Sequence, residues 1–232
     1  MSAKHHLHIA ALIPSHLTPT EVIDALQDHN TTLTLQALTT GHEKLSSTDP
    51  ETLKDTYWYP IDLNPVHTYS VTECVTFLPG VGQWGKKLLT FPSCYQNIPT
   101  GIKSRADVSG VTVRAEYRVM KGGIDGEIDG EGQGVGDAAW VLVEDAEVTC
   151  SPWLMPFVKK KMELAHRDIC RKVIEKVEMQ RRQHDIAQSV GRGQEVLRAR
   201  VVSVNATRAE ADAMETQRIE LPAPGSQKIF YA

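Results

Sequence analysis

Aromatic residues are scarce in this chain, and it has no long apolar run. Only 6% of its 232 residues are aromatic, and no stretch approaches the roughly 20 apolar residues that a membrane-spanning helix needs. Positive charge is not in excess either, because 25 Lys and Arg residues face 29 Asp and Glu residues, for a net charge of -4. A broad phosphate-binding surface requires the opposite balance. We therefore expect neither an integral membrane segment nor a nucleic-acid partner.

The four cysteines show none of the spacings of a zinc or redox site. Cys74, Cys94, Cys150 and Cys170 include no C-x-x-C pair and have no histidine at zinc-like spacing. The N-terminal residues lack the basic segment and apolar core of a secretory signal. These features predict reduced, mostly buried thiols in a cytoplasmic protein.

Cofactor motifs are incomplete throughout the chain. Asp125, Glu127 and Asp129 have the spacing that opens a calcium loop, but Gly136 stands where that loop needs its bidentate glutamate. The glycines of 122–136 do not lie between a strand and a helix, as the G-x-G-x-x-G motif of dinucleotide sites requires. The hydrolase and metalloprotease motifs G-x-S-x-G and H-E-x-x-H are missing. The sequence therefore predicts a protein that needs neither a metal nor an organic cofactor.

Alternating apolar residues predict a run of antiparallel strands. The alternation is clearest in residues 67–77, 111–120 and 138–150. The charged residues of 111–120 fall on one side, which is typical of a sheet with one face in water. Aromatic residues give 56–63 the character of a strand as well.

A strand and a helix precede this run. Residues 5–13 alternate as a strand does. Thr18 is followed by Pro19 and then by Glu21, and together they form the capping-box pattern of a helix N-terminus. We therefore expect the chain to begin with a strand and a short helix.

The longest predicted helix covers residues 152–182. Its apolar residues recur every three or four positions and its remaining surface is charged, which is typical of a helix lying on an apolar surface. The three lysines at 159–161 are interpreted as part of its solvated side, because they are too few to indicate a membrane or nucleic-acid site. Beyond this helix the periodicity fades, and residues 184–232 are expected to form a polar tail.

These elements predict an α+β protein in which a curved antiparallel sheet is wrapped around a long C-terminal helix. Residues 1–183 form the folded domain, and 184–232 form the tail. A sheet that is covered on its inner face by one helix leaves space for an internal apolar cavity, which is a common site for a small hydrophobic ligand. The sequence indicates no oligomeric state.

Two segments resemble the helix-grip superfamily, which comprises the START-like and Bet v 1-like proteins. They are the opening HHLHIAALIPSHLTPTEVIDALQDHN (5–30) and the closing AAWVLVEDAEVTCSPWLMPFVKKKMELAHRDICRKV (138–173). Between them, residues 57–107 match in the order and character of their strands. The chain is most similar to a fungal family of START-like proteins with no settled function. The resemblance implies a helix-grip fold and a cavity that carries lipids, senses ligands, or cyclises polyketides and related natural products.

Two carboxylates fall on strand faces that are otherwise apolar. Glu73 shares its face with Tyr69, and Glu144 shares its face with Leu142 and Ala146. Burial without a partner would raise the pKa of each carboxyl, which suits a general acid or base near neutral pH. Alternatively, each one pairs with a lysine or arginine, or a bulge turns it outward.

His166 borders the apolar stripe of the long helix, so it is placed to point into the cavity and transfer protons. The alternative is a packed histidine that is bound by backbone or water. Glu73, Glu144 and His166 form the predicted catalytic group. Large apolar and aromatic residues are expected to line the cavity, although core packing explains each of them equally well. They are Tyr59, Tyr69, Phe77, Tyr117, Trp140, Leu142 and Met162.

The predicted function is exercised on a small hydrophobic molecule in this cavity. The first hypothesis is a cofactor-independent cyclase or isomerase of secondary metabolism, acting on an intermediate such as a polyketide or terpenoid, including by a pericyclic route. Holding a flexible substrate in a reactive conformation can itself supply much of the rate enhancement. The second is a non-catalytic carrier of lipids or metabolites, and the third is a regulatory binding module that acts through the tail. Inward polar residues favour the enzyme, whereas a uniformly apolar cavity favours the carrier.

Overall fold

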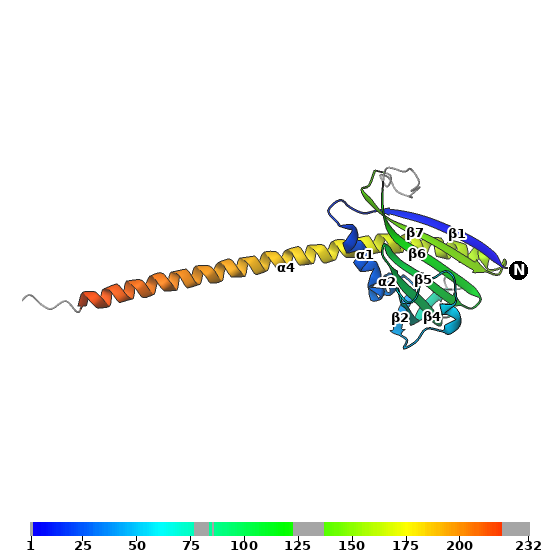
Figure 1. Cartoon of the computed structure of the whole chain (residues 1–232), viewed down its shortest axis with the longest axis horizontal. Helices are drawn as coiled ribbons and strands as arrows, with labels where there is room; N and C mark the ends of the chain where they lie inside the picture. The colour runs from blue at the N-terminus through cyan, green and yellow to red at the C-terminus, as the bar shows by residue number, and fades with distance from the viewer. Residues whose placement is uncertain (1, 77–83, 85, 123–136, 220–232) are drawn as a thin grey trace, which may run out of the picture. The chain divides into compact units, whose positions relative to one another are not determined.

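An antiparallel sheet and the first part of a long helix form the folded body of the chain (Figure 1). The computed structural model describes residues 2–76, 84, 86–122 and 137–219. In these residues seven strands pair in the order β1-β7-β6-β5-β4-β3-β2, and every pair is antiparallel. The elements in chain order are β1 (Ala3–Leu12), α1 (Pro19–Gln27), α2 (His29–Leu35), β2 (Thr39–Lys44), α3 (Pro50–Leu53), β3 (Val66–Thr76), β4 (Lys86–Ile98), β5 (Gly101–Val108), β6 (Val111–Lys121), β7 (Trp140–Cys150) and α4 (Met155–Ile219).

The first and last strands of the chain lie side by side (Figure 1). β1 pairs with β7 along its whole length, from Ala3 opposite Cys150 to Leu12 opposite Val141. The other edge of the sheet is β2, which pairs with β3. The chain therefore returns to its own first strand just before α4 begins.

The capping box predicted at the first helix is confirmed. The backbone N–H of Glu21 donates to Thr18 Oγ1 at 3.3 Å, and the backbone N–H of Thr18 donates to Glu21 Oε2 at 2.7 Å. Pro19 is the first residue of α1. A cap of this kind contributes about 1 kcal/mol to helix stability. It fixes the start of α1, whose Val22 and Leu26 are buried in the core.

One face of the sheet forms the core with α1 and the first part of α4. Leu142, Ala146 and Val148 of β7 point to this inner face and are buried. Full burial of one such aliphatic side chain contributes roughly 1.5–3 kcal/mol. The predicted α+β helix-grip fold, a curved antiparallel sheet around a C-terminal helix, is confirmed. The α4 residues in the core are Met162, Ile169, Cys170, Val173, Ile174 and Val177.

The segment 56–63, for which the sequence predicts a strand, is instead a series of turns. The carbonyl oxygen of Pro60 accepts hydrogen bonds from the backbone N–H groups of Leu63 (3.2 Å) and Asn64 (3.0 Å). Pro60 and Pro65 lack the N–H groups that a sheet ladder needs, so two prolines override the strand preference of the aromatic residues.

α4 differs from the predicted helix 152–182 at both ends. It begins at Met155, because Pro152 lies in a preceding turn, and it continues to Ile219. No proline occurs between 157 and 221, and the chain there is rich in residues that favour helices. The fading periodicity beyond 182 therefore marks the end of the packing surface and not the end of the helix.

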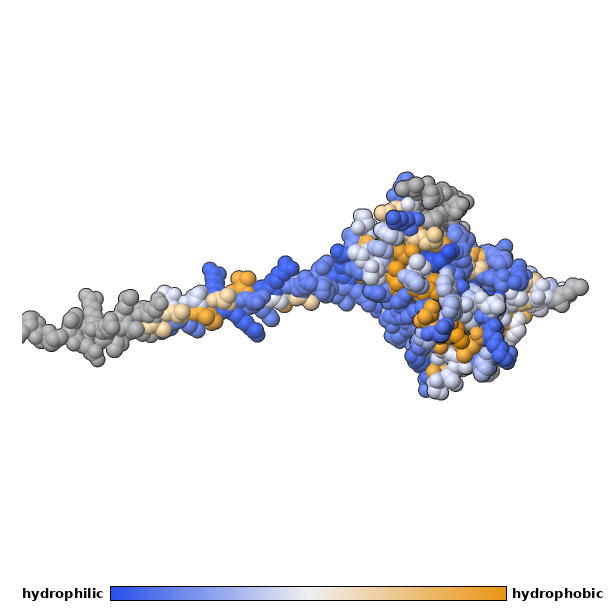
Figure 2. Space-filling view, viewed as in Figure 1, coloured by the Kyte–Doolittle hydropathy of each residue, from blue (hydrophilic) through white to orange (hydrophobic). Residues whose placement is uncertain are grey.

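The chain divides into two compact units, residues 1–179 and residues 180–232. The described part of the second unit is the C-terminal portion of α4, in which Ile186, Val190 and Leu197 are exposed. Figure 2 shows hydrophobic residues scattered among hydrophilic ones along this portion. No helix of the described residues is long and apolar enough to cross a membrane. The division into a domain 1–183 and a tail 184–232 stays a prediction.

All four cysteines are free thiols, as predicted. Cys94, Cys150 and Cys170 are buried, and Cys74 is half-buried. Of these, Cys170 lies closest to the candidate site described next.

Candidate functional site

Glu144 on β7 and His166 on α4 form a hydrogen-bonded pair inside the protein. Glu144 shares the inner face of β7 with Leu142 and Ala146, and its exposed fraction is 0%. Its Oε1 is bound to Nδ1 of His166, whose side chain is 18% exposed. Glu144 thus points towards the helix, and its partner is a histidine rather than the lysine or arginine that was the alternative.

Two further groups bind the Glu144 carboxylate. The thiol of Cys170, one helical turn after His166, donates a hydrogen bond to Oε2 of Glu144, with an Sγ–Oε2 distance of 3.4 Å. Tyr117 stands opposite Glu144 in β6, and its hydroxyl group also hydrogen-bonds to the carboxylate. A buried carboxylate requires such partners, because burying a charge without them is strongly unfavourable. The sequence predicts Cys170 only as a buried thiol, although its position four residues after His166 places both on one helix face.

The Glu144 carboxylate favours a protonated His166. Burial lowers the pKa of His166, but the charge of Glu144 and the hydrogen bond to it raise that pKa by more, so it lies above its usual value. Burial, reinforced by Glu144, raises the pKa of Tyr117 and that of Cys170 well above their usual values. These shifts favour the charged form of the imidazole and the neutral forms of the phenol and the thiol.

Glu73 is a second carboxylate that interacts electrostatically with His166. It lies on the inner face of β3 with Tyr69 and Val71 and is half-buried. Burial raises the pKa of the Glu73 carboxyl, and the positive charge of His166 offsets only part of that rise. No hydrogen bond or ion pair from the described residues holds this carboxyl group. The raised pKa of Glu73 therefore reflects burial without a hydrogen-bonding partner among the described residues.

Most of the predicted lining residues belong to the core on this inner face. Tyr117, Leu142 and Met162 are buried, whereas Tyr69 and Trp140 are partly buried and pack against the core. The hydroxyl group of Tyr69 is also 3.1 Å from Nδ1 of the buried His29 on α2. The structure thus brings these residues to the face of Glu73 and Glu144, and it packs three of them tightly.

Tyr59 does not lie with this group, so its prediction as a lining residue is wrong. It is 43% exposed, and Nζ of Lys103 lies 4.7 Å from the centre of its ring. Lys103 alternates along β5 with Ile102, which faces the core, so Tyr59 covers the outer face of the sheet. The error follows from the turns that replace the strand expected at 56–63.

Phe77, which was also predicted to line the cavity, lies outside the described residues.

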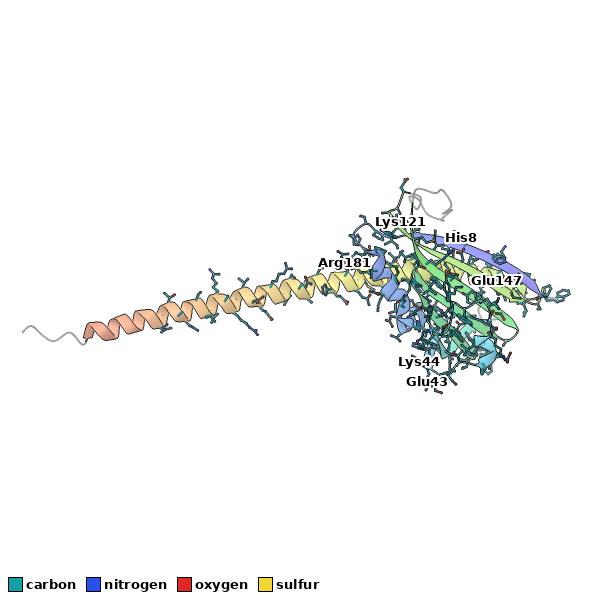
Figure 3. The ribbon with its side chains drawn as sticks, in the orientation of Figure 1. His8, Glu43, Lys44, Lys121, Glu147 and Arg181 are labelled. Carbon is teal, nitrogen blue, oxygen red and sulfur yellow. The ribbon has the colours of Figure 1, made fainter. Side chains whose placement is uncertain are left out.

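A pocket of about 380 Å³ opens on the outer face of the sheet. Charged groups in its wall are paired: His8 Nδ1 lies 2.6 Å from Asp145 Oδ1, and Arg114 Nη2 donates to Asp55 Oδ2 at 2.6 Å. Figure 3 labels His8 and Glu147, which belong to the adjacent strands β1 and β7. This is the water-facing side that the sequence predicts for β6. The internal apolar cavity beside the candidate site stays a prediction.

The described residues contain no group of three or more His, Cys, Asp or Glu side chains that could hold a metal ion. The incomplete calcium-loop motif at 125–136 begins and ends outside those residues. The absence of a metal or an organic cofactor stays a prediction.

Comparison with known proteins gives a family but no activity. Residues 2–179 match the model of a "Domain of unknown function (DUF7053)", and no curated protein matches the chain. Among solved structures, TTHA0849 from Thermus thermophilus is 8% identical with a TM-score of 0.39, over 77% of this chain and 98% of that chain. The Zhui aromatase/cyclase from Streptomyces sp. R1128 is 12% identical with a TM-score of 0.41, over 77% of this chain and 93% of that chain. At these values the likeness says nothing about the activity of this chain.

Proposed function

Because this chain belongs to the DUF7053 family, a domain of unknown function, its own residues must indicate its activity, and we propose that it is a cofactor-independent cyclase or isomerase. Its substrate is a small hydrophobic carbonyl compound, such as a polyketide or terpenoid intermediate. The observation that carries this proposal is that Glu73, on an otherwise apolar strand face, interacts electrostatically with His166 of the buried Glu144–His166 pair. A role in fungal secondary metabolism and a cytoplasmic location stay predictions.

Glu73 is the general base of the proposed reaction. Its half-buried carboxylate removes a proton from the carbon next to the substrate carbonyl, and its raised pKa brings it closer to the working pH. The electron pair of the broken C–H bond forms the C=C bond of an enolate as the carbonyl π electrons move to the oxygen. Return of the proton from Glu73 to another carbon completes an isomerisation. For a cyclisation, the enolate carbon attacks a second carbonyl of the same molecule, the first carbonyl re-forms, and Glu73 gives its proton to the new alkoxide oxygen.

His166 stabilises the enolate oxygen. Its Nδ1 is bound to Glu144, so Nε2 is the atom that donates to the substrate. A donor that carries a positive charge in a site shielded from water stabilises developing negative charge strongly. Glu144 is fully buried and acts through the imidazole, so it is a positioning residue rather than a catalytic one. Cys170 and Tyr117 hold Glu144 in turn.

A non-catalytic carrier is the second candidate function. The apolar core around the cluster favours it, because a carrier needs only a hydrophobic surface for its ligand. The inward charges favour the enzyme, because a carrier gains nothing from the unfavourable burial of Glu73. The two functions differ in one measurable respect: an enzyme transfers protons to or from a bound ketone, whereas a carrier only binds it.

Deuterium incorporation tests this proposal. The probe is 4-phenylbutan-2-one, an apolar ketone, and NMR follows the loss of its α-protons in D₂O. We expect the protein to accelerate this exchange by roughly 10²–10⁴-fold, and Glu73→Gln and His166→Gln to remove the acceleration. Glu43→Gln is the matched control, because it makes the same chemical change at an exposed carboxyl on β2 (Figure 3).

Two results would overturn the enzymatic proposal. One is saturable binding of the ketone without acceleration of exchange, which identifies a carrier. The other is equal acceleration by the wild type and Glu73→Gln, which removes Glu73 from the chemistry.

A further inference from the structure

Exposed apolar and lysine side chains share one face at the start of α4. Trp153 is 90% exposed and Phe157 is 74% exposed, and Leu164 is exposed as well. These three residues are four and seven positions apart, so they follow one line along the helix and the turn before it. Lys160 and Lys161 come three and four positions after Phe157, on the same face, and both are exposed.

The same stretch of α4 has a separate face that packs on the sheet. Met155 and Val158 pack against the core, and Met162 is buried in it. The exposed residues are therefore not a poorly packed part of the core. We name the exposed set the α4 patch: Trp153, Leu154, Phe157, Lys160, Lys161 and Leu164.

A second exposed group lies at the same end of the sheet. Thr112, near the start of β6, is opposite Thr149, near the end of β7. The first residues of β4 lie towards this end too, on a strand that β5 and β6 separate from β7. They are Lys86, Lys87 and Leu88, and all three are exposed. Figure 1 shows that α4 starts at the end of the sheet where β1 begins.

Positive charge is concentrated here although the whole chain carries a net charge of -4. No ion pair from the described residues neutralises Lys86, Lys87, Lys160 or Lys161. Lys159 differs from them, because it lies on another face of α4 and is 3.9 Å from Glu163. The sequence alone shows three adjacent lysines, whereas the fold adds a second lysine pair and aligned aromatic residues.

We propose that the α4 patch, together with Lys86, Lys87 and Leu88, docks the protein reversibly on an anionic membrane surface. Tryptophan and phenylalanine side chains at the lipid interface bury their rings among the headgroups, and leucine adds apolar area. Lysines beside them are attracted to anionic headgroups. This combination of aromatic, aliphatic and basic side chains is the chemistry of a peripheral membrane contact.

Charge also argues against a second copy as the occupant of this surface. A two-fold dimer would place the same patch on both subunits, so the unneutralised lysines would face one another. Anionic lipid headgroups, in contrast, attract these lysines. The docking surface does not include Glu73, Glu144 or His166, so this inference is independent of the proposed reaction.

Vesicle flotation with the full chain tests the inference. The probes are phosphatidylcholine vesicles with and without about 30% phosphatidylserine, at low salt and at about 0.5 M salt. We expect binding to the anionic vesicles, little binding to the neutral ones, and release at high salt. Trp153→Ala/Phe157→Ala and Lys160→Gln/Lys161→Gln should each weaken binding by about tenfold or more.

Matched controls separate the patch from general surface properties. Leu63→Ala removes an exposed apolar side chain away from this end, and Lys44→Gln/Lys121→Gln removes two exposed lysines that Figure 3 labels. Both controls should bind as the wild type does, and circular dichroism should show all variants folded. The inference is overturned if anionic vesicles fail to bind the wild type, or bind the patch variants equally. It is also overturned if the same substitutions abolish self-association or nucleic-acid binding instead.

Discussion

Nδ1 of His166 on α4 is hydrogen-bonded to Oε1 of Glu144 on β7, and this contact ties the C-terminal helix to the sheet. Both residues face the core, and Cys170 and Tyr117 complete the shell around the carboxylate. Glu73 on β3 interacts electrostatically with the same imidazole. We propose that residues of β3, β7 and α4 together form one acid–base group.

Replacing Glu144 with Gln should lower the pKa of His166. The substitution removes the charge that holds this pKa up and leaves the effect of burial, which lowers it. It should also destabilise the fold by about 1–3 kcal/mol, since buried hydrogen-bond partners are left mismatched. An NMR titration of the imidazole measures the pKa. Asp145→Asn, one residue along β7 but on the outer face, is the control, and equal His166 pKa values in both variants would contradict the account.

Glu73 should make folding less favourable as the pH rises. The pKa of its carboxyl is 4.5 when unperturbed and is raised in the folded protein by burial. The contribution of this group to stability is therefore fully present below pH 4.5 and is lost as the pH rises through the folded pKa. Urea unfolding at a series of pH values should show this loss in the wild type and not in Glu73→Gln. Parallel curves for the two proteins would mean that the carboxyl lies in water.

Leu142 should act as a core residue and not as a ligand contact. Its side chain is fully buried on the inner face of β7, so Leu142→Ala should reduce the free energy of unfolding by about 2–5 kcal/mol. Leu63→Ala, at an exposed leucine, should change it by about 0.5 kcal/mol or less. A Leu142→Ala protein that unfolds like the wild type but loses ligand affinity would restore the lining role.

A chain that ends at residue 183 should fold. The core cluster takes its last residue from Val177, and the first compact unit ends at 179. Removing 184–232 should therefore shift the thermal midpoint by only a few degrees, which corresponds to about 1 kcal/mol or less. Calorimetry measures the shift. Loss of cooperative unfolding would show that the C-terminal part of α4 is needed for the fold.

Sequence patterns predicted most of the fold because alternation and burial coincide in β6 and in the second half of β7. Side chains alternate between the two faces of a strand, and this alternation is a local property of each strand. It therefore placed Glu73 and Glu144 on inner faces without any information about the partner strands. The capping box at Thr18 is equally local. These features identified both carboxylates of the candidate site.

The remaining features depend on contacts or competing effects that such patterns do not contain. Tyr59 was misplaced because Pro60 turns the chain after a segment with strand preference. The end of α4 at Ile219 was missed because helix propensity continues after the packing surface ends. Cys170 was missed because its contact with Glu144 crosses from the helix to the sheet.

The pH dependence of α-proton exchange follows the two groups assigned to the chemistry, Glu73 and His166, and is the sharpest test of the proposed reaction. For 4-phenylbutan-2-one, the wild-type rate should rise with pH as Glu73 loses its proton, and then fall as His166 loses its own. Glu73→Gln should abolish the rising limb and bring the rate close to that in buffer, while Glu43→Gln keeps the whole profile. A wild-type profile that persists unchanged in Glu73→Gln would contradict the account.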